Sequence, residues 1–346
     1  MGKQIIRDEI GSEFWSVPVA ERKTHIFPED MRWFVSGTSA LKCILRDIRS
    51  YRKIKSAAIP SWCCGCMIEP FLDQGIAVSF YTVAPDENGR LFCDYSSAPP
   101  CDLTLVISYF GYSDQNVIGE PSGLVVRDLT HSLFCPGQAD ADYYFGSLRK
   151  WAGFLTGGYA WKKEEWTDLD EVEPIDPAYA ALRKDAMQNK LRYLRGERED
   201  KGYLQQFEQA EDYLDHIQIM KGDAEDRIAA LHFDAESVRK NRLRNARILL
   251  GELDDLALFR HVEETDCPLF FPILLDTKQR EGLRRYLIEE RIYCPVHWEI
   301  TDSHRLTIDQ RFLYDHELSI VCDQRYGPDE MDRIVKTIRT YLKDKE

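Results

Sequence analysis

The sequence has no block of clustered lysine and arginine residues. Its 45 basic residues are outnumbered by 59 acidic ones, which gives a formal net charge of −14 at pH 7. Proteins that bind nucleic acid neutralise phosphates with clustered positive charge, so this balance argues against a nucleic-acid partner. The mixed charges of the stretch 183–200 are most simply interpreted as the solvated face of a helix.

Long apolar runs are also missing. No stretch approaches the roughly 20 apolar residues of a membrane-spanning helix, and residues 1–8 lack the apolar core of a signal peptide. Gly2 does not fit the myristoylation pattern, because Ile6 stands where that pattern requires serine or threonine. We therefore expect a cytoplasmic protein with no membrane partner.

The ten cysteines lack the arrangement of a structural zinc site. Cys63, Cys64 and Cys66 are close together, but such sites present two pairs of ligands and no second pair is found. Without an export signal, we expect reduced thiols that mostly fill the core, and no bound metal.

The first half of the chain contains short, nearly continuous apolar runs bounded by Gly, Pro or Asp. These runs lie at 55–60, 76–83, 103–109, 124–128, 142–147 and 158–161. Helical patterns at about 36–51 and 67–73 separate the earlier ones. Fully apolar strands alternating with helices predict an α/β fold whose parallel or mixed sheet is covered on both faces.

The second half begins with a charged helical region from about 176 to 253. The last section has strand-like runs at 267–275 and 318–322 and helical patterns at 279–291 and 329–342. We expect residues 1–222 to form an N-terminal arm and a large domain with a helical connection, and residues 223–346 to form a smaller C-terminal α+β domain.

A single lysine, Lys150, stands at the end of an aromatic run. Residues 143–151 read Tyr-Tyr-Phe-Gly-Ser-Leu-Arg-Lys-Trp, and two glycines follow at 157–158. An amine held against aromatic rings is costly unless it has a partner or a chemical role. Covalent attachment to an aldehyde cofactor is one such role, and extension of the lysine into solvent is the alternative.

Two further features precede this lysine. Residues 36–39, Ser-Gly-Thr-Ser, come before a helix, where unpaired amides and the helix dipole suit a phosphate, although they would also form an ordinary N-cap. Asp128 ends an apolar strand, where it could keep the ring nitrogen of a pyridine cofactor protonated or simply cap a loop. His131 could orient Asp128 or the phenolic oxygen of the cofactor.

The order of phosphate loop, acid and lysine is that of pyridoxal phosphate (PLP) enzymes with a large α/β domain. The chain resembles the DegT/DnrJ/StrS family of PLP-dependent sugar aminotransferases, in particular its short members with an Arg-Lys-aromatic pattern at the lysine. The segments that carry the resemblance are 36–41, 59–62, 109–111, 128–131 and 146–151. The likeness spans roughly residues 30–165 and continues more loosely through 267–292 and 318–338.

The resemblance implies the fold-type-I aminotransferase architecture and a homodimer with active sites at the subunit interface. It implies that Lys150 is the Schiff-base lysine and proton shuttle, and that Asp128 pairs with the pyridine nitrogen. His131 would lie near the phenolic oxygen. Trp62 is the available residue to stack on the cofactor ring, while Cys64 occupies the alternative aromatic position.

The resemblance also implies which residues hold the cofactor's phosphate. Thr38 and Ser39 would bind it, Gly37 would allow close backbone approach, and Ser147 would contact the phosphate or the lysine. The chain departs from the family in one respect, because no Gly-x-Asn-x-Arg segment is found to reach into the neighbouring subunit. The region 178–222 is a charged helical stretch instead.

The expected activity is transfer of an amino group from an amino acid, glutamate by expectation, to a keto group on a nucleotide-linked sugar. Such sugars supply surface polysaccharides or glycosylated metabolites. Phe14, Trp15 and the loop 293–298 are expected near the substrate entrance, with His297 and Trp298 as candidate sugar or nucleotide contacts.

Three alternatives compete with this interpretation. A PLP enzyme could act on a non-sugar keto substrate, or a non-catalytic relative could keep the fold in a regulatory role. Ser147 and Lys150 also match the Ser-x-x-Lys signature of serine acyltransferases, but the Lys-Thr-Gly element that this chemistry requires does not follow.

Overall fold

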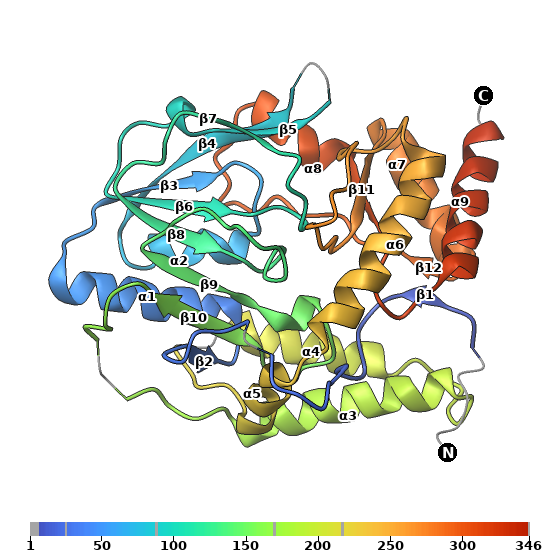
Figure 1. The fold of residues 1–346 in the computed structure, drawn as a ribbon, viewed down its shortest axis with the longest axis horizontal. Helices are drawn as coiled ribbons and strands as arrows, with labels where there is room; N and C mark the ends of the chain where they lie inside the picture. The colour runs from blue at the N-terminus through green and yellow to red at the C-terminus, as the bar shows by residue number, and fades with distance from the viewer. Residues whose placement is uncertain (1–6, 25, 87–88, 169–170, 216–217, 345–346) are drawn as a thin grey trace.

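The computed structural model describes residues 7–24, 26–86, 89–168, 171–215 and 218–344 (Figure 1). Residues 1–6, on which much of the expectation about a signal segment rests, lie outside the described residues. Within these ranges no helix has both the length and the apolar character needed to cross a bilayer.

A nine-stranded mixed sheet forms the centre of the large domain. Its strands are β2 (Arg32–Phe34), β3 (Ser56–Pro60), β4 (Ala77–Pro85), β5 (Leu91–Asp94), β6 (Leu103–Ile107), β7 (Asn116–Ile118), β8 (Leu124–Asp128), β9 (Tyr143–Ser147) and β10 (Gly158–Lys162). Their order is β2-β10-β9-β8-β6-β3-β4-β5-β7. The neighbours from β9 through to β4 are parallel, whereas β10 runs antiparallel to both β9 and β2. This arrangement confirms the predicted α/β fold.

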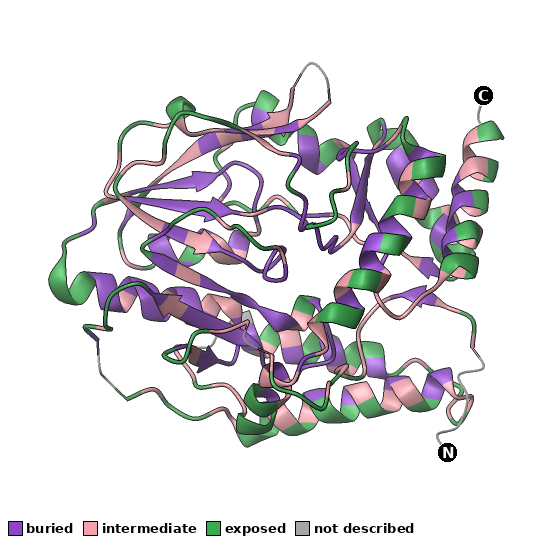
Figure 2. Cartoon of the chain, in the orientation of Figure 1, coloured by how far each residue is buried: buried purple, intermediate pink, exposed green. Residues whose placement is uncertain are grey.

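The central strands are buried along nearly their whole length (Figure 2). Burial on both faces explains why they appear in the sequence as continuous apolar runs rather than as alternating patterns. The helix α1 (Gly37–Tyr51) lies across the sheet next to β9 and β10 and buries Leu41, Ile44, Leu45 and Ile48. The expected helix at 67–73 is two short turns instead, η1 (Gly65–Met67) and α2 (Glu69–Leu72).

The charged region after the large sheet folds into helices α3 (Pro177–Leu194), α4 (Tyr203–Asp215), α5 (Ala224–Leu231) and α6 (Ala235–Leu253). α3 and α4 pack against each other along the base of the molecule in Figure 1. Arg183 and Lys190 are buried on the same face of α3 as Tyr179 and Ala186. The interpretation of this stretch as a solvated face is therefore wrong for these two charged residues.

The C-terminal part has a two-stranded antiparallel sheet of β11 (Phe271–Leu274) and β13 (Glu317–Ile320). α7 (Thr277–Glu289) contacts β13 and packs against α9 (Pro328–Lys343), whereas α8 (Phe312–His316) contacts α7 and β4 of the large sheet. The N-terminal arm joins this part, because β1 (Ile10–Gly11) pairs in parallel with β12 (Ile292–Tyr293). The apolar core of the C-terminal part contains Ile10 and residues from Ala246 onward. Ala230 and Phe233, which come earlier in the chain, pack against residues of the large domain instead.

Candidate active site

The amino end of α1 lies beside the carboxyl end of β9. Ser36 caps the helix by accepting a 3.1 Å hydrogen bond from the amide of Ser39. A Cβ atom added to Gly37 would lie 3.5 Å from the carbonyl oxygen of Gly146, an ordinary contact, so the protein itself leaves room there. The first-turn amides of Gly37 and Thr38 lack intrahelical partners and, with the helix dipole, suit an anion.

The hydroxyl of Ser39 is engaged within the protein. It accepts a 2.9 Å hydrogen bond from the amide of Met220 and lies 3.3 Å from the Met220 carbonyl oxygen. Ser39 therefore ties the segment after α4 to the start of α1. Thr38 is only half-buried, and its hydroxyl is within hydrogen-bonding reach of the Cys66 thiol. Of the two hydroxyls predicted to bind a phosphate, that of Thr38 is the more available.

Asp128 is the last residue of β8 and is 1% exposed. Its Oδ1 accepts a 2.7 Å hydrogen bond from the Thr130 amide, while Oδ2 is buried with no hydrogen-bond partner among the described residues. Burial raises the pKa of Asp128 to about 6. An ionised carboxylate in this place is stabilised only by a cationic or hydrogen-bonding partner, which a ligand can provide.

His131 lies on the turn after β8 and is buried. The centre of its ring is 4.8 Å from that of Phe110 and 5.6 Å from that of Trp298, and it is nearly parallel to the latter. Its Nδ1 has no hydrogen-bond partner in the described part of the chain. Burial, and then the charge of Lys150, lowers the pKa of His131 to about 3, so the imidazole is neutral and close to Lys150.

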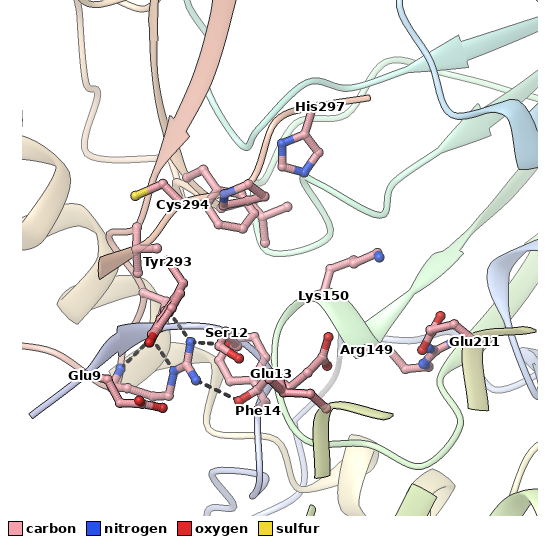
Figure 3. Close-up of a pocket in the computed structure, with 18 of the residues that line it drawn as sticks. Glu9, Ser12, Glu13, Phe14, Arg149, Lys150, Glu211, Tyr293, Cys294 and His297 are labelled. Carbon is pink, nitrogen blue, oxygen red and sulfur yellow. Dashed lines mark hydrogen bonds and ion pairs between the residues drawn. The ribbon is translucent and has the colours of Figure 1, made fainter. Parts of the chain in front are cut away.

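Lys150 ends the short helix η3 (Leu148–Lys150), which follows β9 directly. Because Asp128 pairs with Phe145, strands β8 and β9 end at the same edge of the sheet and bring the lysine to the Asp128 side. The exposed side chain of Lys150 lines a cavity of about 480 Å³. Figure 3 shows its amine between His297 on one side and the pair Arg149 and Glu211 on the other.

Ser147 connects the lysine segment to the acid. Its amide donates a 3.2 Å hydrogen bond to Oγ1 of Thr130, and the indole of Trp151 donates a 2.7 Å hydrogen bond to the Thr130 carbonyl. Ser147 pairs with Gly158, whose added Cβ would lie 2.0 Å from the Ser36 carbonyl oxygen. Glycine is therefore required at 158 for the start of α1 to approach the strands that carry the site.

Trp62 does not line the cavity. Its ring is completely buried and stacks on Tyr109 with a centroid separation of 5.1 Å, and its Nε1 donates a 2.6 Å hydrogen bond to the His297 carbonyl. Cys64, at the alternative position, is half-buried, and the Lys150 charge acts on its thiol. Of residues 62 and 64, it is therefore Cys64 whose side chain is near enough to Lys150 to interact with its charge.

Ion pairs that the sequence did not predict surround Lys150. Glu211 of α4 binds Arg149, the residue before the lysine, and also Arg183 of α3, whose Nη1 is 2.8 Å from its Oε1. Arg183 also donates a 3.1 Å hydrogen bond to the Phe154 carbonyl. The buried positions of α3 follow helical spacing, but the charges among them hid that pattern in the sequence.

The N-terminal arm forms another wall of the cavity, which Phe14 lines and Trp15 does not. Arg325 forms an ion pair with Asp323 and donates hydrogen bonds of 3.1 Å to the carbonyl oxygens of Ser12 and Glu13. Its guanidinium also lies 4.0 Å from the centre of the Phe14 ring. These contacts, some of which are drawn in Figure 3, hold the arm against the C-terminal domain.

The cavity is positively charged although the whole chain is acidic. Its cations are Arg149, Lys150, Arg183, Lys201, Arg242, Arg284 and Arg325, and its acids are Glu9, Glu13, Glu211 and Asp323. Lys150, Arg242 and Arg284 have no carboxylate partner among the described residues. Arg242 is completely buried, and its Nη2 has no hydrogen-bond partner there either. The cavity therefore favours anionic ligands.

Several solved structures that share this fold are aminotransferases. Spr1654 of Streptococcus pneumoniae, a candidate sugar aminotransferase in its PMP form, matches with a TM-score of 0.62 and 15% identity over 91% of this chain and 86% of its own. PseC of Helicobacter pylori, an aminotransferase in the biosynthesis of pseudoaminic acid, matches with a TM-score of 0.62 and 13% identity over 96% and 100%. A DegT/DnrJ/EryC1/StrS aminotransferase of Brucella abortus matches with a TM-score of 0.57 and 16% identity over 90% and 86%.

No family sequence model and no curated protein sequence matches the chain. The structural likeness spans nearly the whole chain and includes the mixed sheet and the C-terminal domain. The chain therefore has the fold-type-I architecture of the DegT/DnrJ/EryC1/StrS aminotransferases.

Proposed function

We propose that this protein is a PLP-dependent aminotransferase that transfers an amino group from an amino acid, glutamate by expectation, to a keto group on a nucleotide-linked sugar. The observation that carries the proposal is the buried Oδ2 of Asp128, which has no hydrogen-bond partner among the described residues. It lies at the same sheet edge as Lys150, in a fold shared with solved aminotransferases.

The residues present fit the cofactor. A protonated pyridine nitrogen would supply the partner that Asp128 Oδ2 lacks, and the phenolic oxygen would suit the unpartnered ring nitrogen of His131. The start of α1 would hold the phosphate with the amides of Gly37 and Thr38 and the Thr38 hydroxyl. When bound, PLP supplies an electron sink for negative charge at the carbon that carries the amine.

The protein's own residues would then act as follows. Asp128 keeps the pyridine nitrogen protonated, because a carboxylate in an apolar site favours a paired cation. Lys150 holds the cofactor through its amine and moves a proton at the substrate carbon. The other lysine that lines the cavity, Lys201, is bound to Glu9 and Tyr293. Glu211 positions this segment by binding Arg149.

The charges of the cavity support anionic substrates. We propose that Arg242, buried and with Nη2 unpaired among the described residues, binds the carboxylate of the amino donor. Arg284 is exposed on α7 at the same cavity and would bind the phosphates of the acceptor. Sugar acceptors are supported by the description of PseC as an enzyme of pseudoaminic acid biosynthesis.

We propose a cytoplasmic homodimer. The arm and α4 of the same chain contribute Phe14 and Glu211 to the cavity, and the expected partner would close its cofactor side. Light scattering during chromatography would measure the mass. A strictly monomeric enzyme with full turnover would overturn the shared site.

The first experiment tests the cofactor. Purified protein incubated with PLP should absorb in the visible, and borohydride should attach the cofactor to Lys150, as located by peptide mass spectrometry. Lys190 is the matched competitor, because it is 1% exposed, its amine has no hydrogen-bond partner among the described residues, and burial lowers its pKa to about 7. Attachment at Lys190, or no visible band, would refute the assignment.

The second experiment tests the substrate. Glutamate is offered with a panel of nucleotide-linked keto-sugars and, separately, with simple keto acids. Turnover of the sugars supports the proposal. Turnover confined to keto acids would favour the non-sugar alternative, and cofactor binding without any turnover would favour a regulatory relative.

A further inference from the structure

His297 projects into the cavity from the C-terminal domain, on the side opposite Arg149 and Glu211 (Figure 3). Its backbone is fixed on both sides, because its amide donates a 2.8 Å hydrogen bond to Oε2 of Glu317 and its carbonyl accepts from Trp62. Its ring Nδ1 lies 2.9 Å from Oγ of Ser319. The other ring nitrogen, Nε2, has no hydrogen-bond partner among the described residues, and it is the atom left for a ligand.

Glu317 lies behind this ring and is completely buried. Ser319 forms a short hydrogen bond with Oε1 of Glu317, so the carboxyl, the hydroxyl and the imidazole make one continuous chain. Glu317 has no ion pair in the described part of the protein. Its burial raises the pKa of Glu317 to about 8, against the weaker effects of its hydrogen bonds to Ser319 and His297.

We propose that His297 presents a protonated Nε2 to an oxygen of the acceptor substrate, and that Ser319 and Glu317 behind it fix this tautomer. The identity of the substrate rests on the proposed function, whereas the tautomer does not. His297 is thus a specificity-determining residue that contacts substrate, and Ser319 and Glu317 are positioning residues.

The direction of the hydrogen bonds follows from the charge of Glu317. A neutral Glu317 donates to Ser319 Oγ, Ser319 donates to Nδ1 of His297, and the ring proton stands on Nε2. When the cluster loses one proton, Ser319 donates to the carboxylate and Nδ1 donates to Ser319. Nε2 then carries no proton. The proton that the cluster loses thus departs from Nε2 into the cavity, and the resulting negative charge is on the Glu317 carboxylate.

Other charged groups face this cluster. Burial is the main reason that the pKa of His297 lies well below its ordinary value, and the nearby His131 and Lys150 side chains lower it further. The ring therefore stays neutral. Arg280 of α7 acts weakly on Glu317 and is itself bonded to the Tyr314 carbonyl. The Cys294 thiol is protonated at neutral pH, because burial raises its pKa to about 12. Glu317 is therefore the member of this group that titrates near pH 8.

Nitrogen-15 NMR of histidine-labelled full-length protein measures the tautomer without cofactor or substrate. His297→Gln assigns the signal among the eight histidines. At pH 7 we expect a neutral ring protonated on Nε2, which moves to Nδ1 as the pH rises past 8. Glu317→Gln, whose amide donates to Ser319 at every pH, should keep the proton on Nε2 throughout. A ring that titrates to imidazolium near its ordinary pKa, or an unchanged tautomer in the wild type, would overturn the proposal.

Kinetics give the functional readout. In the wild type, KM for the acceptor should rise about tenfold between pH 7 and 9.5, the effect of one lost hydrogen bond. KM for the amino donor should change less. Glu317→Gln should remove the acceptor-specific rise, whereas Ser319→Ala should raise acceptor KM at both pH values. An identical pH profile in wild type and Glu317→Gln would refute the positioning role even if the protein proves to be an aminotransferase.

Discussion

The amide of Thr130 donates a 2.7 Å hydrogen bond to Oδ1 of Asp128. This bond fixes the carboxyl group and leaves Oδ2 buried without a partner among the described residues. The carboxyl is therefore held in one orientation, and its second oxygen lacks a hydrogen-bond donor, which the described chain does not supply.

Asp128→Asn should keep this orientation and remove the charge. We expect turnover to fall at least about 100-fold, corresponding to about 3 kcal/mol of electrostatic stabilisation, with the cofactor still bound. Steady-state kinetics and the visible spectrum of the loaded variant check both parts. Turnover near that of the wild type would return Asp128 to a structural role.

The same substitution should stabilise the protein without cofactor. Because the pKa of Asp128 in the folded protein is raised to about 6, folding favours the neutral acid, and stability declines as pH rises from about 4 through 6. The loss is at most about 3 kcal/mol, and an amide avoids it. Thermal melts of cofactor-free protein should show Asp128→Asn above the wild type at pH 7.5, with the gap closing toward pH 4.

Arg242 and Arg284 should affect different substrates. Arg242→Lys keeps the charge but loses the second guanidinium nitrogen, so we expect KM for the amino donor to rise about tenfold or more. Arg284→Ala, on the exposed side of the cavity, should raise KM for the acceptor instead. Equal effects of both substitutions on both substrates would contradict the assigned subsites.

Cys64 should be the most reactive thiol near neutral pH. Its Sγ lies 3.1 Å from that of Cys66, whose hydrogen bond, aided by the charge of Lys150, lowers the pKa of Cys64 to about 7. Iodoacetamide labelling followed by peptide mass spectrometry should modify Cys64 first. Cys66→Ala removes the donor and should move this reaction to higher pH, whereas a fast thiol elsewhere would refute the prediction.

Lys162 and Asp47 form a buried ion pair of 2.8 Å beneath α1, and Tyr143 donates a further 2.5 Å hydrogen bond to Asp47. Lys162→Met leaves the carboxylate unpaired and should cost about 3–5 kcal/mol in denaturant unfolding. The exposed pair of Lys163 and Asp140 is the matched control, and Lys163→Met should change stability little.

The cost of Lys162→Met should shrink in acid. Burial alone would raise the pKa of Asp47, but the amide of Asp168, then Lys162 and Tyr143, lower it below its ordinary value. Its contribution is therefore complete above the ordinary carboxyl pKa and is lost as pH falls through the lowered one. If the stability cost of Lys162→Met stays constant as the pH falls to the lowered pKa of Asp47, the ion pair does not make this contribution.

The sequence predicts the centre of the sheet better than its edges. Leu103–Ile107 is buried at every position and is recognised as an apolar run. The sequence does not predict β5 or β7, because neither has a continuous apolar signal. β5 alternates between buried and half-buried residues, and Val117 and Ile118 in the edge strand β7 are largely exposed. Strand pairing, rather than local composition, places them in the sheet.

Local signals also single out Lys150 and Asp128 as candidate site residues, since each stands at or just after the end of an apolar strand. The ion pair of Glu211 with Arg149 and the relay from Glu317 to His297 had no such signal. Their partners are separated in sequence and meet only when helices and domains pack, and a charged residue in a helix is usually solvated. The surroundings of His297 and Glu211 are therefore harder to predict than the strand ends that carry Asp128 and Lys150.

Because Ile10 pairs with Ile292, the N-terminal arm can take its place only after most of the chain has been synthesised. The sheet and helix that carry Thr38, Asp128 and Lys150 are complete in sequence once residue 162 has left the ribosome, and domains commonly fold as units in that order. The arm cannot close until β12 and Arg325 have been made. The nascent protein would thus contain the residues proposed to hold PLP long before the arm and the C-terminal domain close the cavity, so under the proposed function PLP could bind before synthesis ends.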